Sequence, residues 1–161
     1  MKRILVAVFA ANLLLLVAAV LLLPARVAMH FGPGGVPDRW GDRTEYAIVM
    51  SVVLVVCSIV AWFPVWINRR MPDAWFNLPN KDYWLREENR TEMYRRLDRI
   101  MLGFGTAILL FFLGVQVLVL AAHFQEPVLL NSPLMLTGLG LLGVYIIYFN
   151  LRLLRSFRIP K

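Results

Sequence analysis

The sequence predicts an all-α membrane protein: a bundle of four transmembrane helices with both chain ends in the cytoplasm. Of its 161 residues 60% are hydrophobic and only 17% are charged, a balance that leaves too little polar surface for a water-soluble domain of this size. Four uncharged runs of 18 to 23 residues cover 4–23, 46–67, 100–122 and 134–151. Because a helix of about 20 apolar residues spans a hydrocarbon core, we expect one integral membrane domain over residues 1–161.

The first run also admits a second interpretation. Lys2 and Arg3 resemble the basic start of a cleaved signal peptide. However, the apolar stretch of 4–23 is longer than the roughly 7–15 residues of such signals, and no small-x-small cleavage site follows Leu23. We therefore expect 4–23 to be a retained span.

The distribution of Lys and Arg predicts the orientation. Fourteen of the 17 lie before the first run, in 68–99 or after the fourth run, whereas three lie in 24–45 and none in 123–133. Cytoplasmic loops carry the excess of positive charge, so we expect 24–45 outside and 68–99 inside, in a multi-pass protein of a bacterial cytoplasmic membrane. The basic side would face anionic lipid, so the lipid bilayer is the expected partner. This explains the positive charge without nucleic acid, which we do not expect as a partner.

The outer loop holds the densest polar chemistry of the chain. Its segment "MHFGPGGVPDRWGDR" (29–43) is rich in Gly and Pro, which is typical of a tight, turn-built loop rather than a helix. Local ion pairs and a closed hairpin between spans would explain it structurally. The functional alternative is a surface that binds a ligand or partner, an extracytoplasmic peptide or toxin among them, and its candidate residues are His30, Phe31, Pro37, Asp38, Arg39, Trp40 and Asp42.

A metal site is a second alternative for the same side. An imidazole and nearby carboxylates are ligands for a divalent cation, and the candidates are His30, Asp38, Asp42, His123 and Glu126. Their spacing matches no metal-binding motif, so we expect no cofactor and keep a divalent metal as the lesser alternative.

The outer loop carries a family resemblance. The segment "LPARVAMHFGPGGVPDRWGDR" (23–43) resembles the signature of an uncharacterised bacterial membrane domain that also forms the N-terminal part of SdpI-type toxin-immunity proteins. The matching residues are Pro24, His30-Phe31, Gly35, Pro37-Asp38 and Trp40-Gly41. The resemblance implies a domain over roughly the first 70 residues. It also implies a role like that of the best-studied relatives, which protect the cell from a secreted killing peptide and relay its presence to a cytoplasmic repressor.

The inner loop, 68–99, has two parts. Residues 72–85 are rich in aromatic side chains, which is typical of a segment anchored at the headgroups. Residues 87–99 have a helical pattern in which Glu92 precedes two arginines by three and four positions, an order that stabilises helices, and this helix is expected to run into the third span. A solvated helix explains the pattern. The alternative is a surface for lipid or a cytoplasmic regulator, with candidates Trp75, Tyr83, Trp84, Arg95 and Arg96.

The spans contain few polar residues and no charge. Asn12 and Gln116 are expected to hydrogen-bond between helices at mid-depth. "GLGLLG" (138–143) matches a dinucleotide-binding pattern by letter only, because no strand precedes it. Small residues in spans also permit close helix contacts and a homo-oligomer. Ionisable groups in spans usually mark ion pathways, and the lack of them in the four runs argues against a coupled pump.

Together these patterns predict a non-enzymatic membrane binding protein of the immunity or sensor type, which recognises a ligand or peptide at its outer loop. The alternatives are a membrane-embedded metal-dependent enzyme or factor built on the outer His, Asp and Glu residues, and an accessory subunit of a membrane complex.

Overall fold

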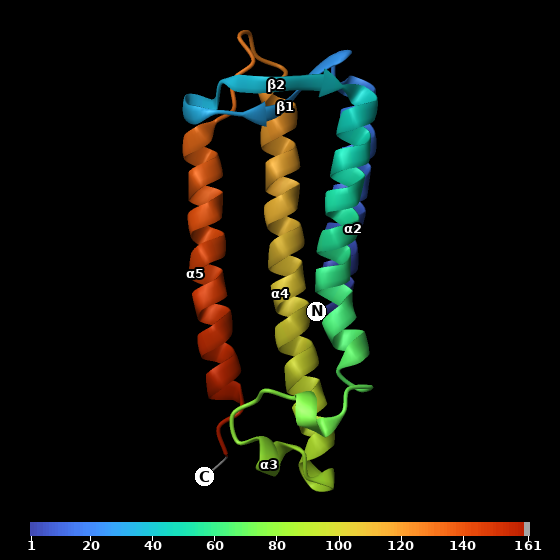
Figure 1. Ribbon diagram of the computed structural model, residues 1–161, viewed down its shortest axis with the longest axis vertical. Coiled ribbons are helices and arrows are strands. Elements are labelled where there is room, and N and C mark those ends of the chain that lie inside the picture. The colour runs from blue at the N-terminus through green and yellow to red at the C-terminus, as the bar shows by residue number, and fades with distance from the viewer. Residues whose placement is uncertain (160–161) are drawn as a thin grey trace.

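The computed structural model describes residues 1–159 and is mostly helical (Figure 1). Four long helices lie side by side: α1 (Lys2–Leu22), α2 (Arg43–Ile67), α4 (Glu87–Ala122) and α5 (Ser132–Ser156). Each is long and apolar enough to cross a membrane, which suggests a multi-pass membrane protein. The four spans expected from the sequence are thus present as helices. The expected continuation of the inner helix is also confirmed, since α4 runs unbroken from Glu87 through the third apolar run.

The connecting segments gather at the two ends of the bundle. At one end, β1 (Arg26–Phe31) and β2 (Pro37–Asp42) form a hairpin that lies across the helix ends, beside the α4–α5 loop (Figure 1). We call this the hairpin end. At the other end, a 3-10 turn, η2 (Asp73–Trp75), and the short helix α3 (Lys81–Trp84) connect α2 to α4. We call this the basic end.

The outer loop is a closed hairpin, as its structural explanation predicted, but the hairpin consists of two strands, which the expected all-α fold did not include. β1 and β2 pair antiparallel, and a 3-10 turn, η1 (Pro33–Gly35), connects them. The Gly and Pro residues that predicted turns are concentrated in and around η1, whereas the segments on either side are extended. The register is irregular around His30, so neither strand shows the strict apolar–polar alternation by which a strand is recognised in a sequence.

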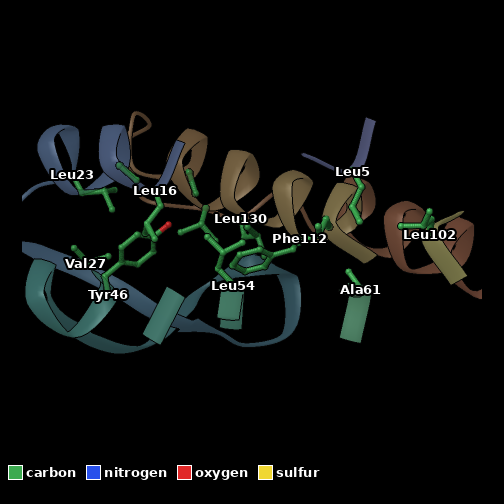
Figure 2. Close-up of a cluster of buried hydrophobic side chains, with 14 residues drawn as sticks. Leu5, Leu16, Leu23, Val27, Tyr46, Leu54, Ala61, Leu102, Phe112 and Leu130 are labelled. Atoms are coloured by element: carbon green, nitrogen blue, oxygen red, sulfur yellow. The ribbon is translucent and has the colours of Figure 1, made fainter. Parts of the chain in front are cut away.

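The main core lies between α1, α2 and α4. Figure 2 shows Leu5 and Leu16 of α1, Leu54 of α2 and Phe112 of α4 pointing into the same apolar layer. α4 and α2 approach most closely where Gly105 faces Ala61, because a Cβ at position 105 would overlap the backbone of Ala61. α4 supplies buried residues along most of its length, whereas no residue of α5 itself is buried.

A buried polar pair crosses this core, as the sequence predicted. Gln116 Nε2 of α4 donates a hydrogen bond of 2.9 Å to Asn12 Oδ1 of α1, and both side chains are fully buried. Asn12 Nδ2 in turn donates to the carbonyls of Val8 (2.8 Å) and Leu109 (3.0 Å). The pair therefore fixes the register of α1 against α4.

Candidate functional site

The candidate site is formed by the exposed side chains of the β1–β2 hairpin. Val27 and Ala28 of β1 are buried, and Val27 belongs to the main core. The exposed polar side chains come from both strands. Asp42, the last residue of β2, also caps α2, since its carboxylate accepts a hydrogen bond of 2.8 Å from the Glu45 N–H. Asp42 thus has a structural role that the sequence left open.

Two contacts with the α4–α5 segment fix the hairpin to the bundle. Nε2 of His123 accepts a hydrogen bond of 2.9 Å from the Ala28 N–H, while its Nδ1 donates to the Val119 carbonyl at 2.8 Å. These partners require the neutral tautomer with its proton on Nδ1. At the turn, the Leu130 N–H donates to the Gly35 carbonyl at 2.9 Å. The hairpin is therefore held at Ala28 of β1 and at Gly35 of the turn.

The exposed face holds groups of both charges and an aromatic ring. Nδ1 of His30 lies 2.6 Å from Oδ1 of Asp38, with side chains 67% and 51% exposed. Arg39 forms an ion pair with Glu45 of α2. The Arg26 guanidinium stacks 4.7 Å from the ring centre of Trp40. We name the four residues that the sequence predicted here, His30, Asp38, Arg39 and Trp40, the hairpin surface.

The hairpin surface suits recognition by charge and stacking. It consists of a hydrogen-bonded imidazole–carboxylate pair, a guanidinium that is paired with Glu45 and an indole with Arg26 over one face of its ring; Arg and Trp are side chains that typically anchor protein ligands. Arg26 was not predicted as part of it. The sequence signal was weak, because Arg26 reaches Trp40 diagonally across a strand pair that the sequence analysis did not contain.

Two other predicted residues lie beneath rather than on this surface. Phe31 is half-buried, and its ring meets that of His123 edge-on at 6.5 Å. Pro37 is half-buried opposite Phe31 in the strand register. Both position the turn rather than offer contacts to a ligand.

The five candidate metal ligands do not converge. His30 and Asp38 form a pair, Asp42 is engaged as a helix cap, and both nitrogens of His123 are engaged with backbone groups. Glu126 is exposed in the loop that follows α4. Within residues 1–159, no group of three His, Cys, Asp or Glu side chains is placed to hold a metal ion.

At the basic end, the five candidate residues differ in how far they are exposed and in what they contact. Trp84 is not available to lipid or a partner: it is only 2% exposed, and its Nε1 donates a hydrogen bond of 2.8 Å to the Phe157 carbonyl. Arg96 stacks on the Trp84 ring and donates to the Ser156 carbonyl at 2.7 Å. These two side chains hold the end of α5. The indole of Trp75, in contrast, is 72% exposed.

The remaining two candidates have mixed surroundings. Tyr83 is half-buried and meets the Trp84 ring edge-on at 5.1 Å. Arg95 is exposed and donates to Glu92 at 2.6 Å. Hydrogen bonds from Arg95 and Arg96 lower the pKa of Glu92 to about 2.

Comparisons with known proteins find similarity over the segment that contains the hairpin. Residues 7–56 match the family model described as a domain of unknown function, DUF1648. The match covers most of α1, the whole hairpin and the first half of α2. The chain is also 25% identical over 142 residues to an uncharacterised protein of Archaeoglobus fulgidus, covering 80% of this chain and 74% of the relative. No solved structure matches.

Proposed function

We propose that this chain is a non-enzymatic binding protein of the immunity or sensor type in a bacterial cytoplasmic membrane, and that its ligand is a peptide bound at the hairpin surface outside the cell. Four observations support membrane insertion and orientation. The helices are long and apolar enough to cross, the charged residues gather at their ends, most Lys and Arg lie at the basic end, and the hairpin end has few.

The single observation that carries the proposal is the open edge of β2 beside the hairpin surface. The outer edge of β1 is occupied, because the Ala28 N–H bonds to His123. β2 has no strand neighbour other than β1 in the part of the chain that the structure describes. An extended peptide adds to such an edge through its main chain, and neighbouring side chains supply the specificity. His30, Asp38, Arg39 and Trp40 are placed for that second task.

The resemblance to the N-terminal part of SdpI-type toxin-immunity proteins supports a peptide ligand. The matched segment, 7–56, contains the hairpin surface and its β2 edge. A sensor also needs an inner contact for a cytoplasmic regulator, and the exposed indole of Trp75 at the basic end is our candidate for it.

The experiment has two arms. A cell lacking the protein is challenged with peptides secreted by the same strain, and survival is restored by the wild type but not by Asp38→Ala/Trp40→Ala. Phe124→Ala/Gln125→Ala is the matched control, because these two residues are exposed at the same end but lie outside the hairpin. Each variant is quantified in the membrane fraction. Protection by the hairpin variant at wild-type abundance contradicts the proposal, and failure of that variant to accumulate assigns the hairpin a structural role instead.

The second arm tests orientation. Val36 lies at the hairpin turn and is exposed. In a Cys57→Ser background, we expect Val36→Cys to react with a membrane-impermeant maleimide added to intact cells. Labelling only after lysis would place the hairpin inside and overturn the proposed site.

A further inference from the structure

Two cavities at the basic end join into one. The first is a groove of about 760 Å³ along α2, lined mostly by apolar side chains, among them Phe9, Val55, Ile59, Trp62 and Phe63. The second, of about 410 Å³, lies at the end of this groove between α4, the start of α1 and the residues that follow α2. Lys2, Arg69 and Asp98 line both.

The second cavity is strongly cationic. Lys2, Arg69, Arg95 and Arg99 line it, and Asp98 is the one carboxylate among its lining residues. Asp98 Oδ2 accepts a hydrogen bond of 2.7 Å from Arg69, whereas its Oδ1 is buried and has no partner among the described residues. Arg95 is paired with Glu92. Within residues 1–159, neither Lys2 nor Arg99 forms an ion pair with a carboxylate. The charges of Lys2 and Arg99 are therefore available to a ligand here.

The combination matches the two parts of a phospholipid. Lys and Arg bind phosphate oxygens, and basic pockets between transmembrane helices bind anionic headgroups. The apolar groove continues from the charged cavity along the second half of α2, from Trp66 to Val55, where an acyl chain would lie. The boundary between the two parts is marked by Trp66, whose ring is covered by the Arg70 guanidinium at 4.4 Å, an arrangement suited to the headgroup level.

We propose that this composite cavity is a specific site for an anionic glycerophospholipid, with the headgroup phosphate among Lys2, Arg69, Arg95 and Arg99 and one acyl chain in the groove along α2. The site rests on the membrane insertion proposed above, but not on the peptide ligand. Its cations come from the start of α1, the segment just after α2 and the juxtamembrane turns of α4. The bound lipid therefore connects the basic ends of the three helices that form the core.

The experiment uses the purified full chain in detergent and measures lipid retention by native mass spectrometry. Phosphatidylglycerol and phosphatidylcholine with identical acyl chains are offered in equal amounts. We expect phosphatidylglycerol to be retained preferentially, and Lys2→Gln/Arg99→Gln to weaken its retention by roughly fivefold for each cation removed. This variant leaves the Arg69–Asp98 pair intact. The control is Arg155→Gln/Arg158→Gln, which removes two exposed cations at the same end, outside both cavities.

Each outcome decides the proposal. Equal retention of the two lipids, or an equal loss in the control variant, overturns the specific site. Complete displacement of phosphatidylglycerol by millimolar inorganic phosphate also overturns it, because the binding of the acyl chain in the groove would then add nothing to the affinity for the lipid. Release of the protein from membranes by alkaline carbonate contradicts insertion and with it both proposals. Stable insertion without lipid preference overturns only the site proposed here.

Discussion

The buried Asn12–Gln116 pair allows a sharp test of how polar groups hold this bundle together. Asn12 makes three hydrogen bonds, two of them to backbone carbonyls, whereas Gln116 makes one. The Oε1 atom of Gln116 is buried and has no hydrogen-bond partner among the described residues. Replacing either residue by Leu keeps most of the side-chain volume, but the two replacements leave different numbers of buried polar groups unpaired.

The two single variants should therefore differ. Asn12→Leu loses two bonds to carbonyls, at about 0.6 kcal/mol each for a membrane protein, and leaves the whole Gln116 amide unpaired, which costs about 1–3 kcal/mol. We expect a loss of about 2–4 kcal/mol. Gln116→Leu leaves Asn12 Oδ1 unpaired but removes an acceptor that was already unpaired, so the two effects nearly cancel. In the double variant neither side chain leaves a buried amide group without a partner, and the free energy of unfolding is expected to fall by about 1 kcal/mol.

Thermal unfolding in detergent, followed by tryptophan fluorescence, measures these differences. For a chain of this size 1 kcal/mol shifts Tm by about 2–4 °C. We expect Asn12→Leu to lower Tm by roughly 10 °C, and the double variant to be more stable than Asn12→Leu alone. Thr106→Val is the control, because the Thr106 hydroxyl bonds only to the Leu102 carbonyl of its own helix. Equal shifts in the two single variants, or additive shifts in the double variant, would refute the reasoning.

Three further predictions concern the two ends of the bundle. Gly35→Ala should lower Tm and increase protease cleavage in the hairpin, because Gly35 has φ +81 and a Cβ there would overlap the Leu130 carbonyl; an unchanged cleavage pattern would contradict the anchoring contact. Trp84→Phe removes the N–H donor to the Phe157 carbonyl while keeping an aromatic ring, and should destabilise by about 0.5–1.5 kcal/mol, measured as a shift in Tm against wild type. Hydrogen bonds from Arg95 and Arg96 lower the pKa of Glu92 in the folded chain to about 2 from its ordinary value of 4.5, so its contribution to stability is complete above pH 4.5 and disappears as the pH falls towards 2. When Tm is measured as a function of pH, it should fall less between pH 4.5 and 2 in Glu92→Gln than in the wild type. Identical pH dependence of Tm in the two proteins would contradict this role of Glu92.

The sequence predicted those features best that depend on the type of a residue or on the length of a run, and not on contacts between distant segments. Long uncharged runs identify the four helices, because hydrocarbon excludes charge over a fixed length. Asn12 and Gln116 were paired correctly because two amides in apolar runs have few other partners. The exposed residues of the hairpin surface were also found, since charged and aromatic side chains in a Gly- and Pro-rich loop remain at the surface whatever the backbone does.

What the sequence did not predict depends on contacts between distant segments. Trp84 was expected at the headgroups, as aromatic residues near spans usually are, but its indole N–H meets the carbonyl of Phe157, 73 positions away. The sequence allowed for a closed hairpin between the spans, but that this hairpin consists of two paired strands was not predicted, for a related reason. Its buried side is defined by the α4–α5 segment that covers it, through His123 and Leu130. In both cases the contacting residues lie far away in the sequence, so the local sequence pattern of Trp84 or of the hairpin does not reveal them.

These distant contacts also explain how α5 is held without burying any of its own residues. Between α4 and α5 lies an apolar groove of about 540 Å³, lined in part by Gly114 and Gly138. Packing along the helix is therefore incomplete, and the attachment is concentrated at its ends. At the basic end, Arg96 donates a hydrogen bond to the carbonyl of Ser156, the last residue of α5, and Trp84 donates one to the carbonyl of Phe157, the residue that follows. At the hairpin end, the loop that enters α5 is hydrogen-bonded to the turn between β1 and β2. The turn of the hairpin and the segment that contains α3 are therefore connected to opposite ends of α5 by hydrogen bonds to the backbone that flanks this helix.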